Sequence, residues 1–205
     1  MKNSLFHITL LLLFAGLLGQ TAAAQNISLD RDDSRLWIEG SSNVNKFQCR
    51  AARYQTWMEP PTSDTSAQVE VDVAVEGFDC GKRRMNRDLY DTLLSGSHPY
   101  ISFEYLSTES MEFDESTGRY VLRVRGNLTV AGHTNTIEFP LEATIVDENR
   151  ILATGQTTLK MTSYNVEPPS ALLGLVRVND ELTVHFELAA TVNDLELPGN
   201  AENQE

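Results

Sequence analysis

Apolar and polar side chains alternate through YVLRVRGNLTVAGHTNTIEFPLEATI, the stretch from Tyr120 to Ile145. Successive side chains of a β-strand point to opposite faces, so this period of two predicts two strands, each with one apolar face. The strand from Tyr120 to Val130 would extend about 35 Å, which is long for a strand. The apolar face is expected to hold Tyr120, Leu122, Val124, Leu128, Val130, Ile137, Phe139, Leu141, Ala143 and Ile145. Because a long apolar face must be covered, the hairpin needs a second sheet, the far wall of a barrel or a ligand.

Six further segments have the composition of strands. They are Ile27–Ser41, Val44–Tyr54, Val69–Val75, Ile101–Ser107, Ile151–Thr162 and Leu182–Leu188. Consecutive strands joined by short turns favour an antiparallel meander, and eight strands can close on themselves and remove the sheet edges. The interior of such a barrel is filled by side chains or holds one small ligand. We therefore predict an all-β fold, an eight-stranded antiparallel barrel with one short helix.

The short helix is predicted from Asn86 to Leu94. Met85, Leu89 and Leu93 recur every four residues and would form one apolar stripe. Asn86 is a suitable N-cap residue. We expect this helix to cover one end of the barrel.

A basic cluster, Lys82-Arg83-Arg84 with Arg87, stands at the start of the predicted helix in an acidic chain. Arginine can hold a phosphate with two parallel hydrogen bonds, and a helix N-terminus adds partial positive charge. Arg83, Arg84 and Arg87 are therefore candidates for contacting an anionic headgroup. The alternative is a solvated helix start without a ligand.

The first 24 residues have the pattern of a cleaved signal peptide. Lys2 precedes an apolar core from Ile8 to Leu18, and Ala22-Ala23-Ala24 is a small-residue cleavage site before Gln25. The core is shorter than the roughly 20 residues that span a bilayer, and no cysteine follows it. We expect a periplasmic or secreted protein without a lipoprotein anchor and without a transmembrane segment in the mature chain.

Removal of 24 residues from 205 leaves 181, which fits a single domain. We expect that domain over residues 25–193, followed by a polar, mobile tail at 194–205. The full chain has a net charge of −13, and the removed segment contains one Lys and no acid, so the mature charge is −14. Such an acidic protein is not expected to bind nucleic acid.

The two cysteines, Cys49 and Cys80, are expected to form a disulfide, because an exported protein meets an oxidising environment. Their midpoint falls in the turn-rich stretch from Glu59 to Ser66. If this stretch joins two antiparallel strands, the cysteines lie opposite each other and within disulfide reach. The alternative is a metal-binding or redox pair, although the chain has no C-x-x-C motif.

No sequence motif for catalysis or metal binding stands out. His98, His133 and His185 do not have the spacing of metal ligands. The chain also lacks a G-x-S-x-G nucleophile motif and a glycine-rich phosphate loop. We therefore expect no metal, no cofactor and no enzymatic activity.

Five segments occur in a fixed order along the mature chain. They are GSSNVNKF (Gly40–Phe47), MNRDLYDTLLSGSHPYISFEY (Met85–Tyr105), RGNLTVAGHTNTIEFPLEA (Arg125–Ala143), GQTTLKMTSYNVEPP (Gly155–Pro169) and VNDELTVHFEL (Val178–Leu188). Together they resemble the YceI-like family of exported bacterial proteins, from about Asn26 to Val192. The resemblance implies a lipocalin-like barrel that binds a long apolar molecule, such as a polyisoprenoid. The segment Asn43–Cys49 lacks the aromatic-and-histidine pattern that many members carry, so ligand identity stays open.

The expected function is binding of an isoprenoid or fatty-acyl lipid inside the barrel, for transport, storage or sequestration. Small inward residues, including Gly126 and Gly155, are expected to leave room for an elongated tail. The expected ligand-binding residues are Phe47, Met85, Leu89, Phe103, Tyr105, Leu122, Val124, Leu128, Ile137, Phe139, Leu141, Leu159, Met161, Leu182, Val184 and Phe186.

Two alternatives stay open at this point. The same apolar residues could form an ordinary packed core, in which case the barrel would act as a stress-related or surface interaction module. An enzyme acting on an apolar substrate would instead need titratable groups inside the barrel, and the inward faces show few. The sequence leaves a homodimer open as well.

Overall fold

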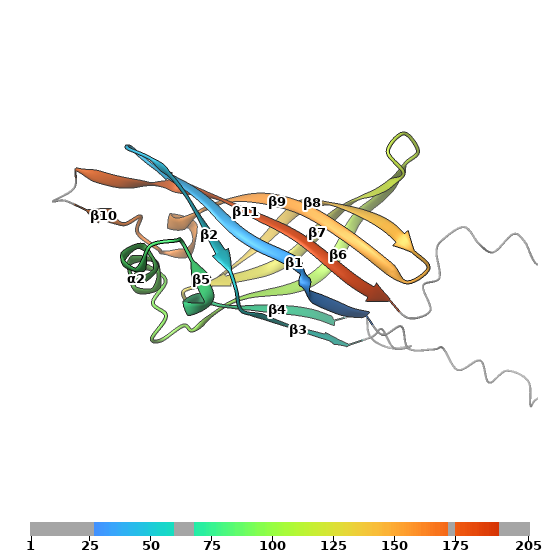
Figure 1. Ribbon diagram of the computed structural model, residues 1–205, viewed down its shortest axis with the longest axis horizontal. Helices are drawn as coiled ribbons and strands as arrows, with labels where there is room; N and C mark the ends of the chain where they lie inside the picture. The colour runs from blue at the N-terminus through green and yellow to red at the C-terminus, as the bar shows by residue number, and fades with distance from the viewer. Residues whose placement is uncertain (1–26, 60–67, 172–174, 193–205) are drawn as a thin grey trace, which may run out of the picture.

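The computed structural model describes residues 27–59, 68–171 and 175–192. The expected signal peptide and the expected tail at 194–205 lie outside these ranges. Within them the fold is all-β with one short α-helix (Figure 1). The strands are β1 (Ile27–Ser42), β2 (Lys46–Ala51), β3 (Tyr54–Glu59), β4 (Gln68–Ala74), β5 (Phe78–Asp79), β6 (Tyr100–Asp114), β7 (Arg119–Val130), β8 (His133–Asp147), β9 (Arg150–Lys160), β10 (Ser170–Ala171) and β11 (Val176–Val192). The helices are α2 (Arg83–Thr92) and the 3-10 turns η1 (Val75–Gly77) and η2 (Met161–Tyr164).

The strands form one antiparallel sheet that curls into a barrel-like form. The hydrogen-bonded order is β3-β4-β6-β7-β8-β9-β11-β1-β2-β5, and β10 pairs with β11. β2 runs into β3 through Ala52 and Arg53, and β4 runs into β5 through η1. The two ends of the order are therefore tied by the chain itself. In Figure 1 the long strands β6 to β9, β11 and β1 wrap around the interior, and α2 lies at one end.

The predicted count of eight strands is wrong, because β3 and the short strands β5 and β10 were not predicted. The segment predicted as Val44–Tyr54 contains β2, which pairs with β1, and its last residue, Tyr54, begins β3, which pairs with β4. The segment predicted as Val69–Val75 corresponds to β4, and η1 separates β4 from β5. Hydrogen bonds from the Ala52 N–H to the Gly77 carbonyl and from the Ala74 N–H to the Arg53 carbonyl bridge the break. The bend lets this part of the chain pair with strands on two sides of the barrel. The alternation of apolar and polar residues alone does not indicate the bend.

The hairpin from Tyr120 to Ile145 forms as predicted, with a longer second strand. Leu122 pairs with Leu141 and Val124 pairs with Phe139 on the inner face. On the outer face, ion pairs join Arg119 to Glu142 at 2.8 Å and Arg125 to Glu138 at 4.0 Å. The apolar face of β7 and β8 therefore points inward.

The β7–β8 turn is two residues long. Ala131 and Gly132 form it with φ values of 48° and 79°. Both residues in the left-handed region are typical of a two-residue hairpin turn that matches the strand twist. His133 follows the turn directly, begins β8 and pairs with Val130.

Replacing Gly132 with alanine should destabilise the protein by about 2 kcal/mol or more, because two costs add. An alanine at this position would have to keep the left-handed backbone conformation, and its Cβ would lie 2.5 Å from Cε1 of His98. Gly118→Ala is a matched control, since Gly118 also has a positive φ of 67° but open space around it. We expect about 1 kcal/mol there. Urea unfolding would measure both, and equal losses would contradict the contact with His98.

The expected disulfide between Cys49 and Cys80 is confirmed. β2 and β5 pair Arg50 with Asp79 and Ala51 with Phe78, so the two cysteines stand at the next opposed positions. Cys49 is 1% exposed and packs with Ile38 and Phe78. The disulfide thus fixes the short β2–β5 ladder at the start of the loop that leads into α2.

The helix differs from its prediction at its start. α2 begins at Arg83, and its N-cap residue is Lys82 rather than Asn86. Asn86 lies inside the helix, where its side-chain oxygen accepts the Cys80 N–H at 2.8 Å and its amide donates to Asp79 at 3.0 Å. Asn86 therefore ties the helix to the disulfide loop instead of capping it.

Candidate functional site: the apolar cavity inside the barrel

The barrel encloses a cavity of about 350 Å³, and its exposed inner surface is apolar. This volume lies near the lower end of the roughly 300–1,000 Å³ typical of ligand pockets. A second, larger hollow of about 550 Å³ lies on the outer face over β4, β6 and β7, and polar residues such as Glu70, Glu104 and Asn127 line part of it. Because the alternating strands direct their apolar side chains inward, the inner cavity is the candidate binding site.

Thirteen of the expected ligand-binding residues line this cavity. They come from β6, β7, β8, β9 and β11 and from α2 and η2, so the walls and one end all contribute. They are Leu89, Phe103, Tyr105, Val124, Leu128, Ile137, Phe139, Leu141, Leu159, Met161, Leu182, Val184 and Phe186.

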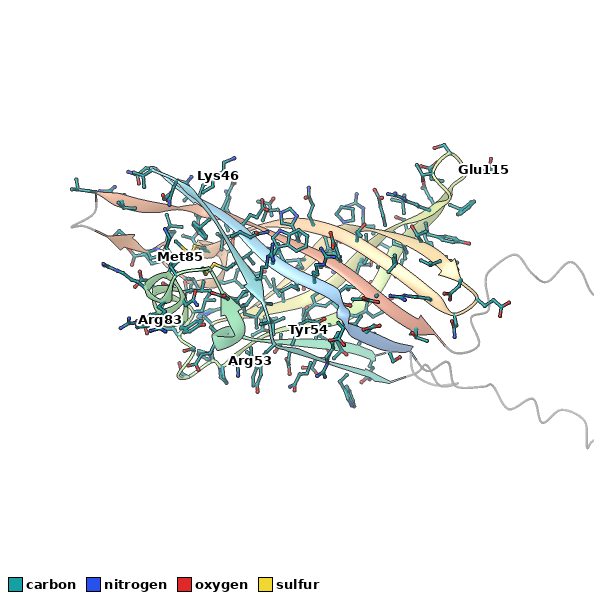
Figure 2. The ribbon with its side chains drawn as sticks, in the orientation of Figure 1. Lys46, Arg53, Tyr54, Arg83, Met85 and Glu115 are labelled. Atoms are coloured by element: carbon teal, nitrogen blue, oxygen red, sulfur yellow. A yellow bond between two sulfur atoms is a disulfide. The ribbon has the colours of Figure 1, made fainter. Side chains whose placement is uncertain are left out.

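The other three expected residues are not among the residues that line the cavity. Phe47 packs against the buried cluster that contains Cys49, Ile38 and Phe78. Leu122 packs against the cluster of Val124, Phe139 and Phe186. Met85 is half-buried on α2 (Figure 2). Their roles in ligand binding stay predictions.

The arginines expected to contact a headgroup are exposed on α2. Arg84 forms an ion pair with Asp88 at 3.9 Å, one helical turn away. The cavity-lining residues do not include Arg83, Arg84 or Arg87. Figure 2 shows Arg83 on the helix at one end of the molecule and Glu115 at the opposite end. A contact between these arginines and a ligand therefore needs a ligand group outside the cavity.

Several cavity residues were not among the expected binding residues. Leu36, Ile38, Val71 and Val73 share the inward faces of their strands, so the period of two could have identified them. Tyr164 and Val166 follow β9 in η2 and the loop after it. No period in the sequence marks these two residues as inward.

The glycines of the inner face do not leave the room that the sequence suggested. The ring of Phe103 lies over Gly126, and the ring of Phe186 lies over Gly155, where a Cβ would collide with them. Phe139 packs edge-on between these rings, with centroid distances of 5.6 Å to Phe103 and 5.4 Å to Phe186. The glycines therefore accommodate aromatic side chains, and the cavity is the space that these rings leave.

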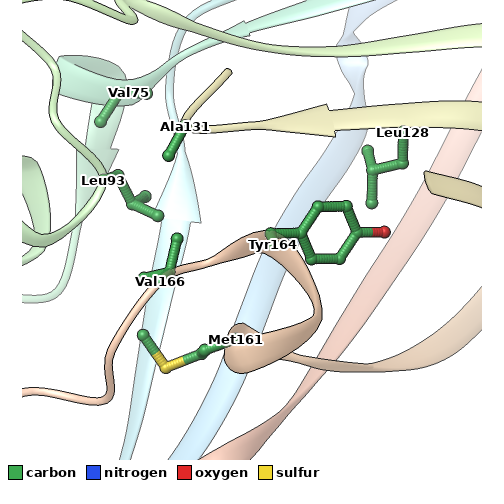
Figure 3. Packing of buried hydrophobic residues seen from close by; sticks show 7 residues of the cluster. All are labelled: Val75, Leu93, Leu128, Ala131, Met161, Tyr164 and Val166. Atoms are coloured by element: carbon green, nitrogen blue, oxygen red, sulfur yellow. The ribbon is translucent and has the colours of Figure 1, made fainter. Parts of the chain in front are cut away.

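One end of the cavity is closed by packed apolar side chains. Val75, Leu93, Ala131, Met161 and Val166 form a buried cluster with Leu128 and Tyr164 between α2, η1, η2 and the β7–β8 turn (Figure 3). We call this the helix end of the barrel. The cluster separates the cavity from solvent on this side.

At the other end the β6–β7 hairpin projects beyond the neighbouring strands (Figure 1). Met111 pairs with Leu122 and Phe113 pairs with Tyr120, so both continue the inner face of the sheet. They are 52% and 54% exposed. An apolar surface therefore leads from the cavity to solvent at this end.

Three tyrosines line the cavity, and their hydroxyl groups differ in their hydrogen-bond partners. The Tyr54 hydroxyl donates to the Arg31 carbonyl at 3.1 Å, which joins β3 to β1. The Tyr105 hydroxyl bonds to that of Thr108 at 3.1 Å. The Tyr164 hydroxyl is buried and has no hydrogen-bond partner within the described part of the chain. Burial raises the pKa of Tyr164 above its usual value, and the Asn135 side chain offsets part of this increase.

Asp180 holds η2, the segment that carries Tyr164, against β11. Its carboxylate accepts the Thr162 N–H at 2.9 Å and the Thr162 hydroxyl at 2.7 Å. These two hydrogen bonds hold the pKa of Asp180 below its usual value, with the backbone N–H as the larger cause. The position of Tyr164 is thus fixed from outside the cavity.

Asp180→Asn should lower the free energy of unfolding at about pH 7, where the wild-type carboxylate is ionised. A pKa that is lower in the folded state stabilises the fold above the unfolded-state pKa, and this stabilisation is lost as pH falls through the folded-state pKa. The difference between variant and wild type should therefore shrink in acid. Urea unfolding from about pH 7 to pH 3 measures it, with the exposed neighbour Glu181→Gln as control. A difference independent of pH would contradict the account.

The three histidines of the described residues make separate contacts. His98 lies against Gly132, and His133 bonds to Asn165 at 3.1 Å. His185 stacks on Trp37 on the outer face, with ring centroids 4.9 Å apart. No group of three potential metal-ligating side chains is found within 27–59, 68–171 and 175–192. Over the same residues, no helix is long and apolar enough to cross a membrane.

Solved structures with the same fold include several bacterial proteins. Burkholderia cenocepacia BcnA is 18% identical, with a TM-score of 0.63, over 80% of this chain and 100% of its own. A polyisoprenoid binding domain from Saccharophagus degradans, implicated in plant cell wall breakdown, is 14% identical with a TM-score of 0.65, over 82% and 99%. The Campylobacter jejuni YCEI protein is 15% identical with a TM-score of 0.57, over 71% and 85%. At these identities the comparisons establish the lipocalin-like fold alone.

The sequence itself matches the YceI-like domain over residues 28–190. A comparison with curated proteins gave no match. The matched range includes every strand that lines the cavity and begins and ends within two residues of the described sheet. The chain therefore belongs to the YceI-like family, as the order of its five sequence segments predicted.

Proposed function

We propose that this protein binds one lipid with a long apolar tail, an isoprenoid or a fatty-acyl chain, inside the barrel. The observation that carries the proposal is the cavity of about 350 Å³ with an apolar inner surface. Each buried CH₂ group contributes about 0.8 kcal/mol, so a tail of several carbons can bind without a specific polar contact. The structural similarity to a polyisoprenoid binding domain points to the same class of ligand.

The mechanism is solubilisation rather than chemical conversion. The cavity replaces water around the tail, and the packed helix end excludes solvent from that side. A tail longer than the cavity would continue along the inner face of β6 and β7, past Met111 and Phe113. This route makes the end opposite α2 the side of ligand access.

The protein is proposed to act outside the cytoplasm, in the periplasm or after secretion. The disulfide supports this location, because disulfides persist in oxidising compartments. Transport, storage and sequestration all use the same binding step.

Thr157→Trp should abolish tail binding by filling the cavity. Thr157 lines the cavity on β9 and pairs with Val184. Thr158→Trp is the matched control, because Thr158 is exposed on the outer face of the same strand. Displacement of N-phenylnaphthylamine by palmitic acid would be measured for wild type and both variants. The proposal predicts displacement in wild type and in Thr158→Trp, and equal binding by both variants would contradict it.

The second candidate is a filled barrel that acts through its outer surface. The rings of Phe103, Phe139 and Phe186, which occupy space that the glycines were expected to leave open, favour it. A protein of this kind would bind neither the dye nor palmitic acid, and the same titration therefore separates the two functions.

A further inference from the structure

Two large aliphatic side chains are exposed to solvent at the helix end of the barrel. Val44, in the turn between β1 and β2, is 65% exposed, and Leu175, just before β11, is 74% exposed. Among the exposed large hydrophobic residues of the described ranges, these two have the largest exposed fractions. Figure 1 places the β1–β2 turn, the start of β11 and α2 at the same end of the molecule.

Hydrogen bonds through Asn43 hold the segments of Val44 and Leu175 together. The Asn43 N–H donates to the Arg177 carbonyl at 3.1 Å, and the Asn43 side-chain amide donates to the Leu175 carbonyl at 2.8 Å. The Arg177 N–H in turn donates to the Asn43 side-chain oxygen at 2.9 Å. The two aliphatic residues therefore belong to one hydrogen-bonded tip, which presents them to solvent together.

The same end of the molecule carries exposed cations. Lys46 follows the β1–β2 turn, and Lys82, Arg83, Arg84 and Arg87, which we call the helix cations, lie at the start of α2. Figure 2 shows Lys46 and Arg83 toward this end. From Lys82 to the end of α2 the chain has four cations and two acids, although its net charge is −13. Aliphatic residues together with Lys and Arg are typical of surfaces that bind the interface of an anionic membrane.

The opposite end of the barrel is also apolar but has the other sign of charge. Met111 and Phe113 are 52% and 54% exposed there. The sequence around them, from Glu109 to Gly118, contains four acids and no cation. A surface of anionic lipids attracts Lys and Arg and repels carboxylates, so it would select the helix end.

We propose that the helix end is a docking surface for a bilayer that contains anionic phospholipids. Val44 and Leu175 enter the headgroup region, while Lys46 and the helix cations contact the lipid phosphates. The inference goes beyond the proposed function and is independent of what the cavity holds. Docking by this end turns the β6–β7 hairpin, and with it the open side of the cavity, away from the bilayer.

Co-sedimentation with lipid vesicles tests the docking surface. The protein would be taken after export, so that the apolar leader expected at 1–24 is removed. It would be mixed with vesicles of phosphatidylcholine alone or of an equal mixture of phosphatidylcholine and phosphatidylglycerol. Two variants remove parts of the surface. The aliphatic variant is Val44→Ser with Leu175→Ser, and the arginine variant combines Arg83→Gln, Arg84→Gln and Arg87→Gln.

Val146→Ser and Arg123→Gln are the matched controls. Val146 is 54% exposed near the end of β8, and Arg123 is exposed on β7, where it pairs with Ser110 of the β6–β7 hairpin. Both controls remove a side chain of the same kind at a distance from α2. All four variants change exposed side chains and should unfold near the urea midpoint of wild type.

Wild type should bind the vesicles that contain phosphatidylglycerol far more tightly than those of phosphatidylcholine alone, and added salt should weaken this binding. The arginine variant should bind about 100-fold more weakly than wild type, since each cation contributes roughly fivefold at an anionic surface. The aliphatic variant should bind about tenfold more weakly, because less apolar surface is buried. Both controls should bind like wild type.

Equal binding of wild type to the two kinds of vesicle, or unchanged binding by the aliphatic or the arginine variant, would overturn the proposal. Losses in the controls as large as those in the helix-end variants would also overturn it, because another face would then contact the bilayer. Absence of binding to both kinds of vesicle would overturn it and leave an acidic protein as the partner of the helix cations. Displacement of the dye by palmitic acid in solution tests the cavity separately.

Discussion

Phe139→Ala is expected to lower the free energy of unfolding by about 3 kcal/mol. Phe139 is 8% exposed and makes edge-on contacts with the rings of Phe103 and Phe186. Truncation of a buried phenylalanine costs about 3–5 kcal/mol, and the lower value applies here because Phe139 already borders the cavity. The variant should also have a larger cavity and accept bulkier ligands.

Phe113→Ala serves as the matched control for this prediction. Phe113 also contacts an aromatic ring, that of Tyr120 at 4.9 Å, but it is 54% exposed on the projecting hairpin. Its truncation should cost less than about 1 kcal/mol. Urea unfolding followed by circular dichroism gives both values, and similar losses for the two variants would show that Phe139 does not belong to a packed interior.

The double variant Cys49→Ala with Cys80→Ala should lose about 3–4 kcal/mol of stability. The disulfide closes a loop across a sequence separation of 31, and a loop of this length restricts the unfolded chain by about that amount. The β2–β5 ladder is two residue pairs long, so it depends on this crosslink more than the long strands do.

The test of the disulfide combines the variant with reduction. Dithiothreitol should shift the urea midpoint of wild type toward that of the double variant and leave the double variant unchanged. A wild-type midpoint that does not respond to reduction, or a double variant as stable as oxidised wild type, would contradict the expected contribution.

The alternation of apolar and polar residues predicted most strands of the barrel, because each strand buries one face and exposes the other. Leu122, Val124 and Phe139 face inward for the reason that the sequence indicated, a strict period of two over a long hairpin. The opposed positions of Cys49 and Cys80 followed from the position of the turn between them. These features depend on local periodicity or on simple symmetry about a turn.

The features that sequence did not predict depend on contacts between distant segments. The break between β2 and β3 occurs because this part of the chain pairs with both β1 and β6. No local sequence pattern predicts pairing with two such distant strands. Gly126 and Gly155 indicated free space, but rings from other strands lie over them. Tyr164 lines the cavity from η2, beyond the end of the predicted strand Ile151–Thr162, where no alternation marks an inward residue.

The central claim is that the interior holds one apolar ligand, and native mass spectrometry of the purified protein tests it most directly. Spectra would be recorded as purified and after incubation with farnesol and with palmitic acid, together with mass spectrometry of an organic extract. We predict one bound molecule per chain, either carried through purification or acquired from a probe. Masses of the bare chain under every condition, with no lipid in the extract, would contradict the account and indicate a filled barrel.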